Sequence, residues 1–196
     1  MRDGFLLVLS GPSGVGKGTV CEALLKKRKD IKYSISATTR KKRPQEKNGE
    51  NYYFLSLDEF KDKIEDGEFI EYAKVHGNYY GTPKSYVVDR IGEGDIVILE
   101  IDVQGALQVK ENYPGAVYIF LLPPDMKELR NRIEKRATED EETINLRMNN
   151  AKNELSFIDK YDYAVINDEI EKTVNKIECI IEAEKLKVTN IQGVKL

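Results

Sequence analysis

The stretch Gly11-Pro12-Ser13-Gly14-Val15-Gly16-Lys17-Gly18-Thr19 decides what the rest of the chain is built around. The apolar run before it, residues 5–9, predicts a buried strand, and the segment after it, residues 20–27, predicts a helix. Strand, glycine-rich turn and helix form the setting in which such a turn binds phosphate, because its backbone N–H groups and the helix N-terminus point at the anion. Lys17 adds a positive charge for the terminal phosphates. The alternative is a glycine-rich turn that holds no ligand.

The loop departs from the usual phosphate-binding pattern at one position. The residue after the lysine is normally Ser or Thr, whose hydroxyl binds magnesium. Here that residue is Gly18, and Thr19 comes one position later. Phosphate binding survives this change, but the loop no longer offers the usual hydroxyl ligand to a metal ion.

Composition limits the kinds of protein that this chain can be. With 196 residues it is long enough for one α/β domain with insertions. The charge sum, 31 − 34 = −3, argues against general nucleic-acid binding. No apolar run approaches the length of a membrane span, so no membrane partner is expected. The two cysteines, Cys21 and Cys179, are expected to be buried free thiols, which fits a cytoplasmic location.

The pattern of apolar residues predicts a doubly wound α/β core. Runs that predict parallel core strands lie near residues 5–10, 33–37, 96–101, 116–122 and 163–166. Helices are predicted between most of them, at about 104–112, 125–136, 140–159 and 171–187.

The segment between the second and third core strands has a different character and predicts a small β-rich insertion. Asn48-Gly49 is a hairpin signal, with residues 51–55 as the returning strand. Ser56 and Glu59 have the spacing of a capping box, so a short helix is expected there, and Gly67 is expected to end it. A strand at 69–73, a turn at 76–83 and a helix at 84–91 follow.

Basic residues that follow the second predicted strand indicate a second phosphate site. Arg40 and Arg43 come a few residues after Ser36, and a guanidinium group pairs with phosphate through two hydrogen bonds. Tyr52 and Tyr80 could add phenolic hydrogen bonds or a stacking surface. A solvated basic loop and purely structural tyrosines are the alternatives.

Two acids with apolar neighbours, Glu71 and Asp102, indicate recognition of a base. Guanine presents an N–H and an NH₂ group side by side, and one carboxylate can accept from both, whereas adenine has an acceptor at the ring position. The hydroxyls of Ser36 and Thr82 could read the remaining guanine groups. Asp102 also ends the strand expected beside the phosphate loop, where it could hold magnesium through water. Solvated acids at strand ends are the alternative.

Arginines also gather on the predicted helices after residue 125. Arg130, Arg132 and Arg136 lie on one helix, and Arg147 lies on the next. Arginines that close over a moving phosphoryl group stabilise the charge that develops on it. The acidic run 139–142 offers surface ion pairing as the alternative.

The chain resembles guanylate kinase along nearly its whole length. The resemblance is carried by residues 11–19, Ser36 with Thr39, Arg40 and Arg43, residues 48–54, 68–71 and 77–82, Glu100-Ile101-Asp102-Val103-Gln104-Gly105, Arg136 with Thr138 and Glu139, and Ile166-Asn167-Asp168. The Gly-Asn-Tyr-Tyr-Gly and Ile-Asp-Val-Gln-Gly stretches are specific. The phosphate loop alone is not, because its Gly-Lys-Gly-Thr form is also similar to adenylate kinase.

This resemblance implies the reaction ATP + GMP ⇌ ADP + GDP with Mg²⁺, GMP or dGMP being the acceptor. It places the GMP phosphate on Arg40, Arg43, Tyr52 and Tyr80, and guanine on Ser36, Glu71, Thr82 and Asp102. It implies that Lys17, Arg136 and Arg147 stabilise the transferring phosphoryl group and that Arg132 assists them. ATP lies on residues 11–19, namely Gly11, Pro12, Ser13, Gly14, Val15, Gly16, Lys17, Gly18 and Thr19, with Asn167 near the adenine. Thr82 stands where the family often has Ser.

The resemblance also implies three parts. A phosphate-loop core with a five-stranded parallel sheet would comprise residues 1–32, 97–123 and 146–196. A GMP-binding insertion would span 33–96, and a helical lid 124–145. The protein is expected to be cytoplasmic and a monomer or homodimer.

Three other functions are alternatives to this one. A kinase for another monophosphate, such as AMP, would have an apolar or amide-lined base pocket, which Glu71 and Asp102 contradict. A non-catalytic interaction module of the same fold would lose the phosphate loop, whereas Lys17 and the glycines are intact. A regulatory nucleotide switch has no need for a second phosphate site.

Overall fold

The core is a five-stranded parallel sheet with helices on both faces. The computed structural model describes residues 4–75, 77–136 and 140–188, with the side chains of Val75 and Arg136 excepted. The sheet has the order β2-β7-β1-β8-β9. Its strands are β1 (Leu6–Ser10), β2 (Ile31–Tyr33), β7 (Ile96–Glu100), β8 (Val117–Leu122) and β9 (Tyr163–Ile166), and each neighbouring pair is parallel. This is the predicted α/β core.

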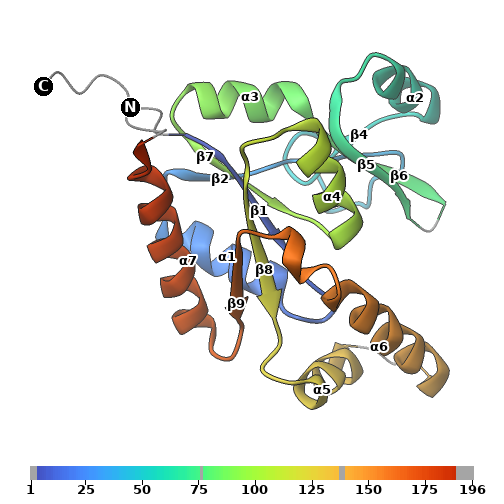
Figure 1. Cartoon of the computed structure of the whole chain (residues 1–196). Coiled ribbons are helices and arrows are strands. Elements are labelled where there is room, and N and C mark those ends of the chain that lie inside the picture. The colour runs from blue at the N-terminus through green and yellow to red at the C-terminus, as the bar shows by residue number, and fades with distance from the viewer. Residues whose placement is uncertain (1–3, 76, 137–139, 189–196) are drawn as a thin grey trace, which may run out of the picture.

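Alternate residues of each central strand serve opposite faces of the sheet. Leu7 and Leu9 pack on helices α1 (Lys17–Lys27) and α7 (Ile170–Lys185). Leu6 and Val8 pack on helices α3 (Lys84–Gly92) and α4 (Val103–Asn112). Burial on both faces explains why β1 and β7 are almost continuously apolar. Figure 1 shows the helices on the two sides of the twisted sheet.

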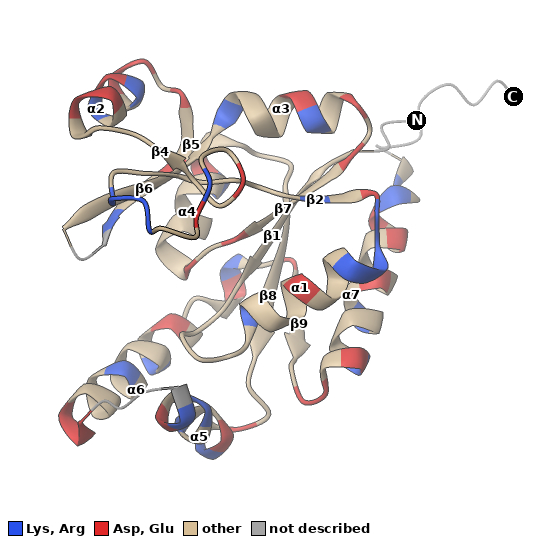
Figure 2. Cartoon of the chain, turned by 180° about the vertical axis from the view of Figure 1, so that it is seen from behind, with Lys and Arg blue, Asp and Glu red and all other residues tan. Residues whose placement is uncertain are grey.

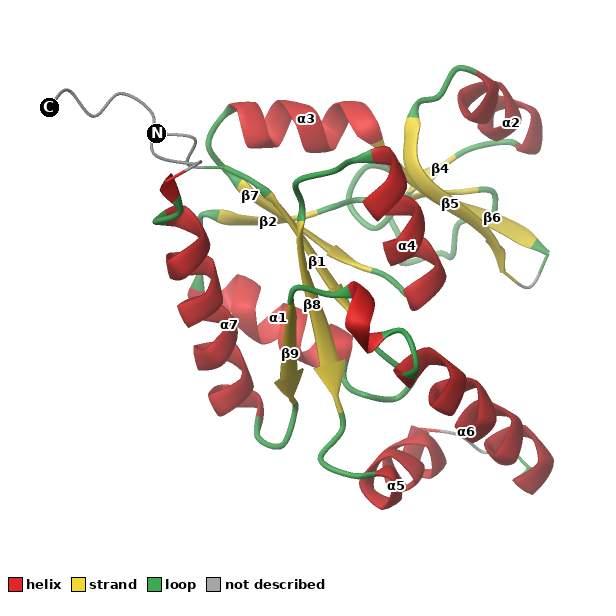
Figure 3. Cartoon of the chain, viewed as in Figure 1, coloured by secondary structure: helices red, strands yellow, loops and turns green. Residues whose placement is uncertain are grey.

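A second sheet forms the predicted insertion. Its order is β4-β3-β6-β5, with β3 (Ala37–Thr38), β4 (Tyr53–Phe54), β5 (Phe69–Val75) and β6 (Asn78–Pro83). Helix α2 (Leu57–Glu65) packs Phe60 against Phe69 and Ala37. The predicted capping box is present, since Glu59 N–H donates to Ser56 Oγ at 3.2 Å and Ser56 N–H donates to Glu59 Oε2 at 2.7 Å. Figure 3 shows this sheet beside the core.

Three local predictions in this region were wrong. The core strand expected at 33–37 lies at Ile31–Tyr33, and Ala37–Thr38 belongs to the second sheet. Asn48-Gly49 does not open a hairpin, because β4 pairs with β3 in parallel. The turn expected at 76–83 is largely strand β6, which pairs antiparallel with β5; His76 lies outside the described residues. Partners distant in the sequence decided the first two pairings, whereas β6 pairs with the strand directly before it.

Two helices form a separate pair at the carboxyl ends of the core strands. They are α5 (Met126–Arg136) and α6 (Glu141–Leu155), and the short 3-10 helix at Ile158–Lys160 follows them. Leu129, Ile133, Ile144, Met148 and Ala151 form the small core of the pair. Figure 1 places this pair and the second sheet on the same side of the molecule. The predicted helix at 140–159 is therefore shorter than expected.

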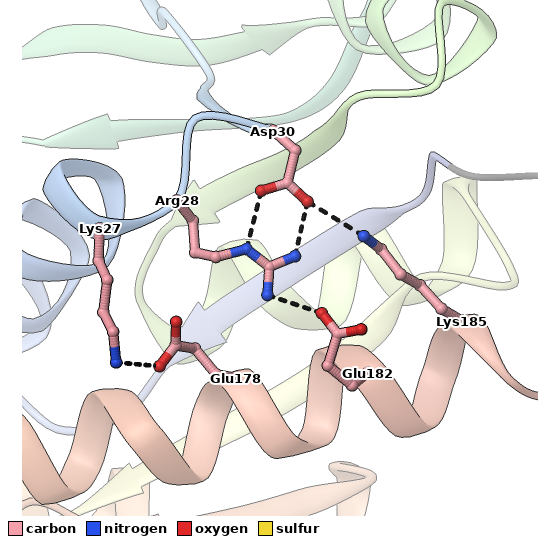
Figure 4. A network of polar contacts seen from close by, with 6 residues as sticks. All are labelled: Lys27, Arg28, Asp30, Glu178, Glu182 and Lys185. Atoms are coloured by element: carbon pink, nitrogen blue, oxygen red, sulfur yellow. Dashed lines mark hydrogen bonds and ion pairs between the residues drawn. The ribbon is translucent and has the colours of Figure 1, made fainter.

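Helix α7 is tied to the end of α1 by charges as well as by packing. Figure 4 shows the cluster, in which Arg28 holds Asp30 through Nε and Nη2 at 2.8 and 2.6 Å and Glu182 through Nη1 at 2.7 Å. Lys185 reaches the same Asp30 at 3.0 Å. Cys21 is buried beneath this face, but Cys179 is exposed, which corrects the expectation of two buried thiols; both are free. Among the described helices, none has the length and apolar character that a membrane crossing requires.

Candidate functional site: two clefts at the carboxyl edge of the sheet

The glycine-rich loop connects the central strand β1 to helix α1, as predicted. Gly11, Gly14 and Gly16 have φ values of 145°, 83° and 101°, which side-chain-bearing residues rarely adopt. A Cβ atom on Gly11 would lie 2.5 Å from the carbonyl oxygen of Leu121 in β8. The loop is therefore pressed against the neighbouring strand, and α1 begins at Lys17 with its free N–H groups at the loop. This geometry suits an anion at the helix N-terminus.

Lys17 folds back over its own loop. Its ammonium group donates to the carbonyl oxygens of Gly11 at 2.6 Å and Pro12 at 3.3 Å. These contacts hold the charge above the loop rather than in solvent. A phosphate chain in the loop would meet this charge directly.

Asn167 and Arg132 brace the other side of the loop. Asn167, 3% exposed, donates from Nδ2 to the carbonyl oxygen of Val15 at 2.8 Å. Arg132 donates to the same carbonyl at 3.1 Å and to the Asn167 carbonyl at 3.1 Å. A hollow of about 330 Å³ adjoins them, lined by Gly14, Gly16, Thr19, Arg132, Lys135, Asn167, Asp168 and Ile170. The structure thus brings the predicted Asn167 and Arg132 together beside the loop.

Helix α6 contacts the loop through Ser13. Arg147, one of the predicted residues, donates from Nη2 to Ser13 Oγ at 3.1 Å. Glu154 accepts the Ser13 backbone N–H at 3.2 Å, and burial raises the pKa of this carboxyl group, although Lys17 acts in the opposite direction. Sequence reasoning missed Glu154. Its seven-residue spacing from Arg147, two turns of the same helix, is the signal that could have found it.

Five of the predicted guanine- and phosphate-binding residues line a second cleft. This cleft has a volume of about 290 Å³ and lies between the second sheet and the end of β7. Its lining includes the predicted Ser36, Tyr52, Glu71, Tyr80 and Asp102, together with Tyr33, Asn51, Ala73, Glu100 and Ile101. Residues from both sheets therefore meet in one hollow.

Two carboxylates meet in this cleft. Glu71, 7% exposed, accepts a hydrogen bond from the Thr82 hydroxyl at 2.6 Å. Burial, helped by the charge of Asp102, raises the pKa of Glu71 to about 7. Asp102 accepts the Gly105 N–H at 2.8 Å and so caps α4. A Cβ on Gly105 would lie 3.2 Å from Glu71 and 3.5 Å from Asp102, so glycine leaves room for both carboxylates.

Arg40 lies behind the tyrosines of the cleft. Its guanidinium carbon is 5.4 Å from the ring centre of Tyr52, and the rings of Tyr52 and Tyr80 are 6.0 Å apart. Arg40 is paired with Glu46, and its pKa is raised chiefly by that pairing. The Arg43 side chain is exposed, and its backbone N–H donates to Glu46 at 2.8 Å. Of the two predicted arginines, Arg40 is the one held beside the cleft.

Glu100 is a second acid that sequence reasoning missed. A Cβ on Gly18 would lie 3.3 Å from Glu100 Oε1, so this carboxylate stands beside the loop position that usually carries a hydroxyl. Glu100 also lines the second cleft. It ends β7 on the same face as Ile98, which packs towards α1. The two-residue alternation of the strand was the available signal.

The remaining predicted arginines differ in their surroundings. Arg136 ends α5, but its side chain lies outside the described part of the chain, as do Thr138 and Glu139. Arg130 pairs with Glu134 at 2.7 Å and with Glu141, which is the surface ion pairing offered above as the alternative. Figure 2 shows basic residues in the segment between β3 and β4 and on α5 and α6, on one side of the molecule.

Comparisons with known proteins agree on one family. Residues 4–184 match the profile described as guanylate kinase. Guanylate kinase of Caldanaerobacter subterraneus subsp. tengcongensis is 56% identical over 95% of this chain and 91% of its own length. That of Clostridium tetani is 54% identical over 98% and 92%.

A solved structure agrees with the sequence relatives. The crystal structure of guanylate kinase from Anaplasma phagocytophilum matches 97% of this chain and 91% of its own, with 38% identity and a TM-score of 0.76. The loop, the two clefts and these full-length matches lead to one conclusion: this chain belongs to the guanylate kinase family.

Proposed function

We propose that the protein transfers the γ-phosphoryl group of ATP to GMP, giving ADP and GDP. The observation that carries the proposal is the cleft that Glu71, which is buried, shares with Asp102 and with Glu100, the acid beside the phosphate loop. A monophosphate bound there would direct its phosphate towards the loop. Family membership supports the same reaction.

We assign the ATP phosphates to Gly11–Thr19 and the adenosine to the hollow beside Asn167. Backbone N–H groups and Lys17 would carry most of the phosphate binding. Arg132 touches the loop carbonyl of Val15, so its proposed help in transfer would come through the loop as well as by charge.

We assign guanine to Glu71, Asp102, Ser36 and Thr82. An ionised Glu71 accepts from the ring N–H and the exocyclic NH₂ of guanine, and Thr82 already holds that carboxylate in place at 2.6 Å. Adenine would place a ring acceptor where guanine has its N–H, so the buried carboxylate would lose that donor, which is the costly outcome for a wrong base. Arg40, Arg43, Tyr52 and Tyr80 would hold the phosphate of GMP.

The chemistry needs positioning and charge stabilisation rather than a covalent intermediate. The attacking GMP phosphate is already an anion, so the protein must align two polyanions and screen their repulsion. Lys17, Arg136 and Arg147 would stabilise the transferring group. Closure of the pair α5–α6 over the loop would exclude water, which otherwise hydrolyses ATP.

We propose a division into a core (1–32, 97–123 and 146–196), a GMP-binding insertion (33–96) and a lid (124–145). The small core of the second sheet supports treating the insertion as a unit. The small core of the α5–α6 pair extends past residue 145 to Met148 and Ala151, so the proposed lid packs on the part of α6 that we assign to the core. We also propose a cytoplasmic location, and a monomer or homodimer.

The residues present fit Mg²⁺ as the partner of ATP. Glu100 and Asp102 would hold it through water near Gly18, where the usual hydroxyl is missing. When bound, the ion would neutralise part of the charge on the phosphate groups. Among the described residues no three acidic, histidine or cysteine side chains cluster as a metal site, so the nucleotide itself would supply further ligands.

A coupled ADP-release assay with ATP and Mg²⁺ tests this function. It compares GMP, AMP, UMP and no acceptor. Turnover with GMP alone is expected. Turnover with AMP instead would contradict the roles given to Glu71 and Asp102. Tight binding of GMP without turnover would favour the non-catalytic interaction module.

A further inference from the structure

Arg40 is held along one edge of its guanidinium group by Glu46. Nη1 donates to Glu46 Oε2 at 3.0 Å and Nη2 donates to Oε1 at 2.7 Å. The two side chains are only 18% and 12% exposed. The pair is therefore bidentate and largely shielded from solvent, unlike most surface ion pairs.

Glu46 also forms a hydrogen bond with the backbone of the segment that carries Arg40. Its Oε2 accepts the backbone N–H of Arg43 at 2.8 Å, while Arg40 Nη1 donates to the carbonyl oxygen of Lys41 at 2.8 Å. The hydrogen bonds from Arg40, with the one from Arg43, lower the pKa of Glu46 to about 2. The Glu46 carboxylate therefore stays ionised, and remains paired with Arg40, at any pH near neutrality.

The bonds to Glu46 and Lys41 use the edge formed by the two Nη atoms. Nε–H takes part in none of them, and the guanidinium group has one further side-chain partner, the Tyr80 hydroxyl of the cleft. Together with the second hydrogen of Nη2, Nε–H forms the other donor pair of the guanidinium fork, which matches two phosphate oxygens. The guanidinium carbon of Arg40 lies 5.4 Å from the ring centre of Tyr52, a residue that lines the cleft, so the guanidinium group lies next to the cleft.

We propose that Glu46 is a positioning residue for the acceptor phosphate: it holds Arg40 by its Nη edge so that the Nε edge is presented to the monophosphate. The inference rests on the proposed function, because it takes the second cleft as the monophosphate site. It gives Glu46 no contact with the substrate. It also opposes the competing idea that Glu46 merely occupies Arg40 until phosphate displaces it.

The two ideas predict opposite effects of Glu46→Ala. If Glu46 positions Arg40, the KM for GMP rises roughly tenfold, the loss expected when a charge-assisted contact is weakened. The kcat and the KM for ATP stay near their wild-type values. If Glu46 competes with phosphate, the KM for GMP falls, and the proposal is overturned. Glu46→Gln keeps one acceptor oxygen and is expected to lie between wild type and Glu46→Ala, with less risk to folding.

A double-mutant cycle shows whether Glu46 acts through Arg40. In the Arg40→Ala background, Glu46→Ala is expected to change the KM for GMP by less than about twofold. Full additivity of the two losses would contradict positioning. Inhibition by guanosine, which lacks the phosphate, is expected to be unchanged by Glu46→Ala. Equal weakening of guanosine and GMP would mean that Glu46 supports the whole cleft instead.

Glu50→Ala is the matched control. Glu50 lies in the same segment and pairs with Lys47 at 3.3 Å, but its side chain is 64% exposed. Its loss should leave every kinetic constant unchanged. The wild-type assay separates the two proposals: if AMP rather than GMP is the acceptor, the base assignment fails, and the cycle is run with AMP. If no acceptor is used, the same cycle is measured by titrating GMP binding.

Discussion

The two proposed phosphate sites are built from different parts of the chain. The loop at Gly11–Thr19 relies on backbone N–H groups, three glycines with positive φ and the first turn of α1. The site around Arg40 relies on side chains, with the guanidinium fixed by Glu46 and stacked on Tyr52. One site is a conformation of the main chain, and the other is a set of oriented side chains on a small sheet.

This difference predicts how each site tolerates substitution. A backbone site fails when its conformation is disturbed, even if no functional group is removed. A side-chain site loses binding in graded steps, because each hydrogen bond can be removed by itself. The loop site also sits on the core sheet, whereas Arg40 lies on the separate second sheet, so damage at Arg40 should leave the core intact.

Gly11→Ala should have the largest effect. The added Cβ would lie 2.5 Å from the backbone oxygen of Leu121, at a φ of 145°. The loop must shift, and kcat/KM for ATP is expected to fall at least about 100-fold, the scale seen when preorganised backbone donors are lost. Gly92→Ala, at the end of α3 with no atom within 4 Å of the new Cβ, is the control for a glycine change. Steady-state kinetics measure both; near-normal activity of Gly11→Ala would contradict a backbone-built site.

Arg40→Ala should act on one substrate only. Loss of a bidentate contact is expected to raise the KM for GMP roughly 50-fold, about 2 kcal/mol, with little change for ATP. The exposed Lys42, two residues away, gives the control Lys42→Ala, which tests whether charge alone matters. An unchanged KM for GMP would remove Arg40 from the phosphate site. An equal loss for ATP would remove the distinction between the two sites.

Local chemistry explains what the sequence could predict. The loop, the capping box of α2 and the helix that Asp125 starts, by accepting the N–H of Glu128 at 2.7 Å, depend on residues a few positions apart. Strand pairing does not, so β2 was predicted at the wrong residues, and β4 was expected in a hairpin although it pairs with β3 in parallel. Among candidate site residues, Glu71, Asp102 and Arg40 were predicted by type and neighbours, and the structure places Glu71 and Asp102 in one cleft. Glu154 was missed because its partner, Ser13, lies 141 residues away.

The proposed guanine site should depend on pH near neutrality because its Glu71 carboxyl group titrates there. The backbone amides of the phosphate loop do not titrate. Burial raises the pKa of Glu71 to about 7, and only the ionised carboxylate accepts both guanine donors. The kcat/KM for GMP is therefore expected to fall about tenfold for each pH unit below 7. A pH profile of kcat/KM measures this, with the KM for ATP as internal reference. Glu71→Gln should be weak at every pH and should lack the inflection near 7.

Stability gives an independent check on the same carboxyl group. The folded pKa of Glu71, about 7, lies above the usual 4.5. Its contribution to folding is therefore present in full below pH 4.5 and is lost as the pH rises through 7. Glu71→Gln does not titrate, so its Tm relative to wild type is expected to rise between pH 5 and pH 8. A constant difference in Tm would mean that Glu71 ionises normally in the folded protein.

Arg28→Ala should have the smallest effect. Arg28 serves as a purely structural arginine with which Arg40 can be compared. Like Arg40, Arg28 holds a carboxylate through two nitrogen atoms, but it joins the end of α1 to α7 (Figure 4). Asp30 and Glu182 are partly exposed, so solvent screening limits the loss to about 1 kcal/mol and a Tm decrease of about 2–4 °C. Thermal unfolding and steady-state kinetics together test it. Both KM values should be unchanged, because the partners of Arg28 belong to the fold and those of Arg40 to a site. A rise in the KM for GMP with Arg28→Ala would show that the second cleft depends on the α1–α7 contact, and the separation of the Arg40 site from the core would fail.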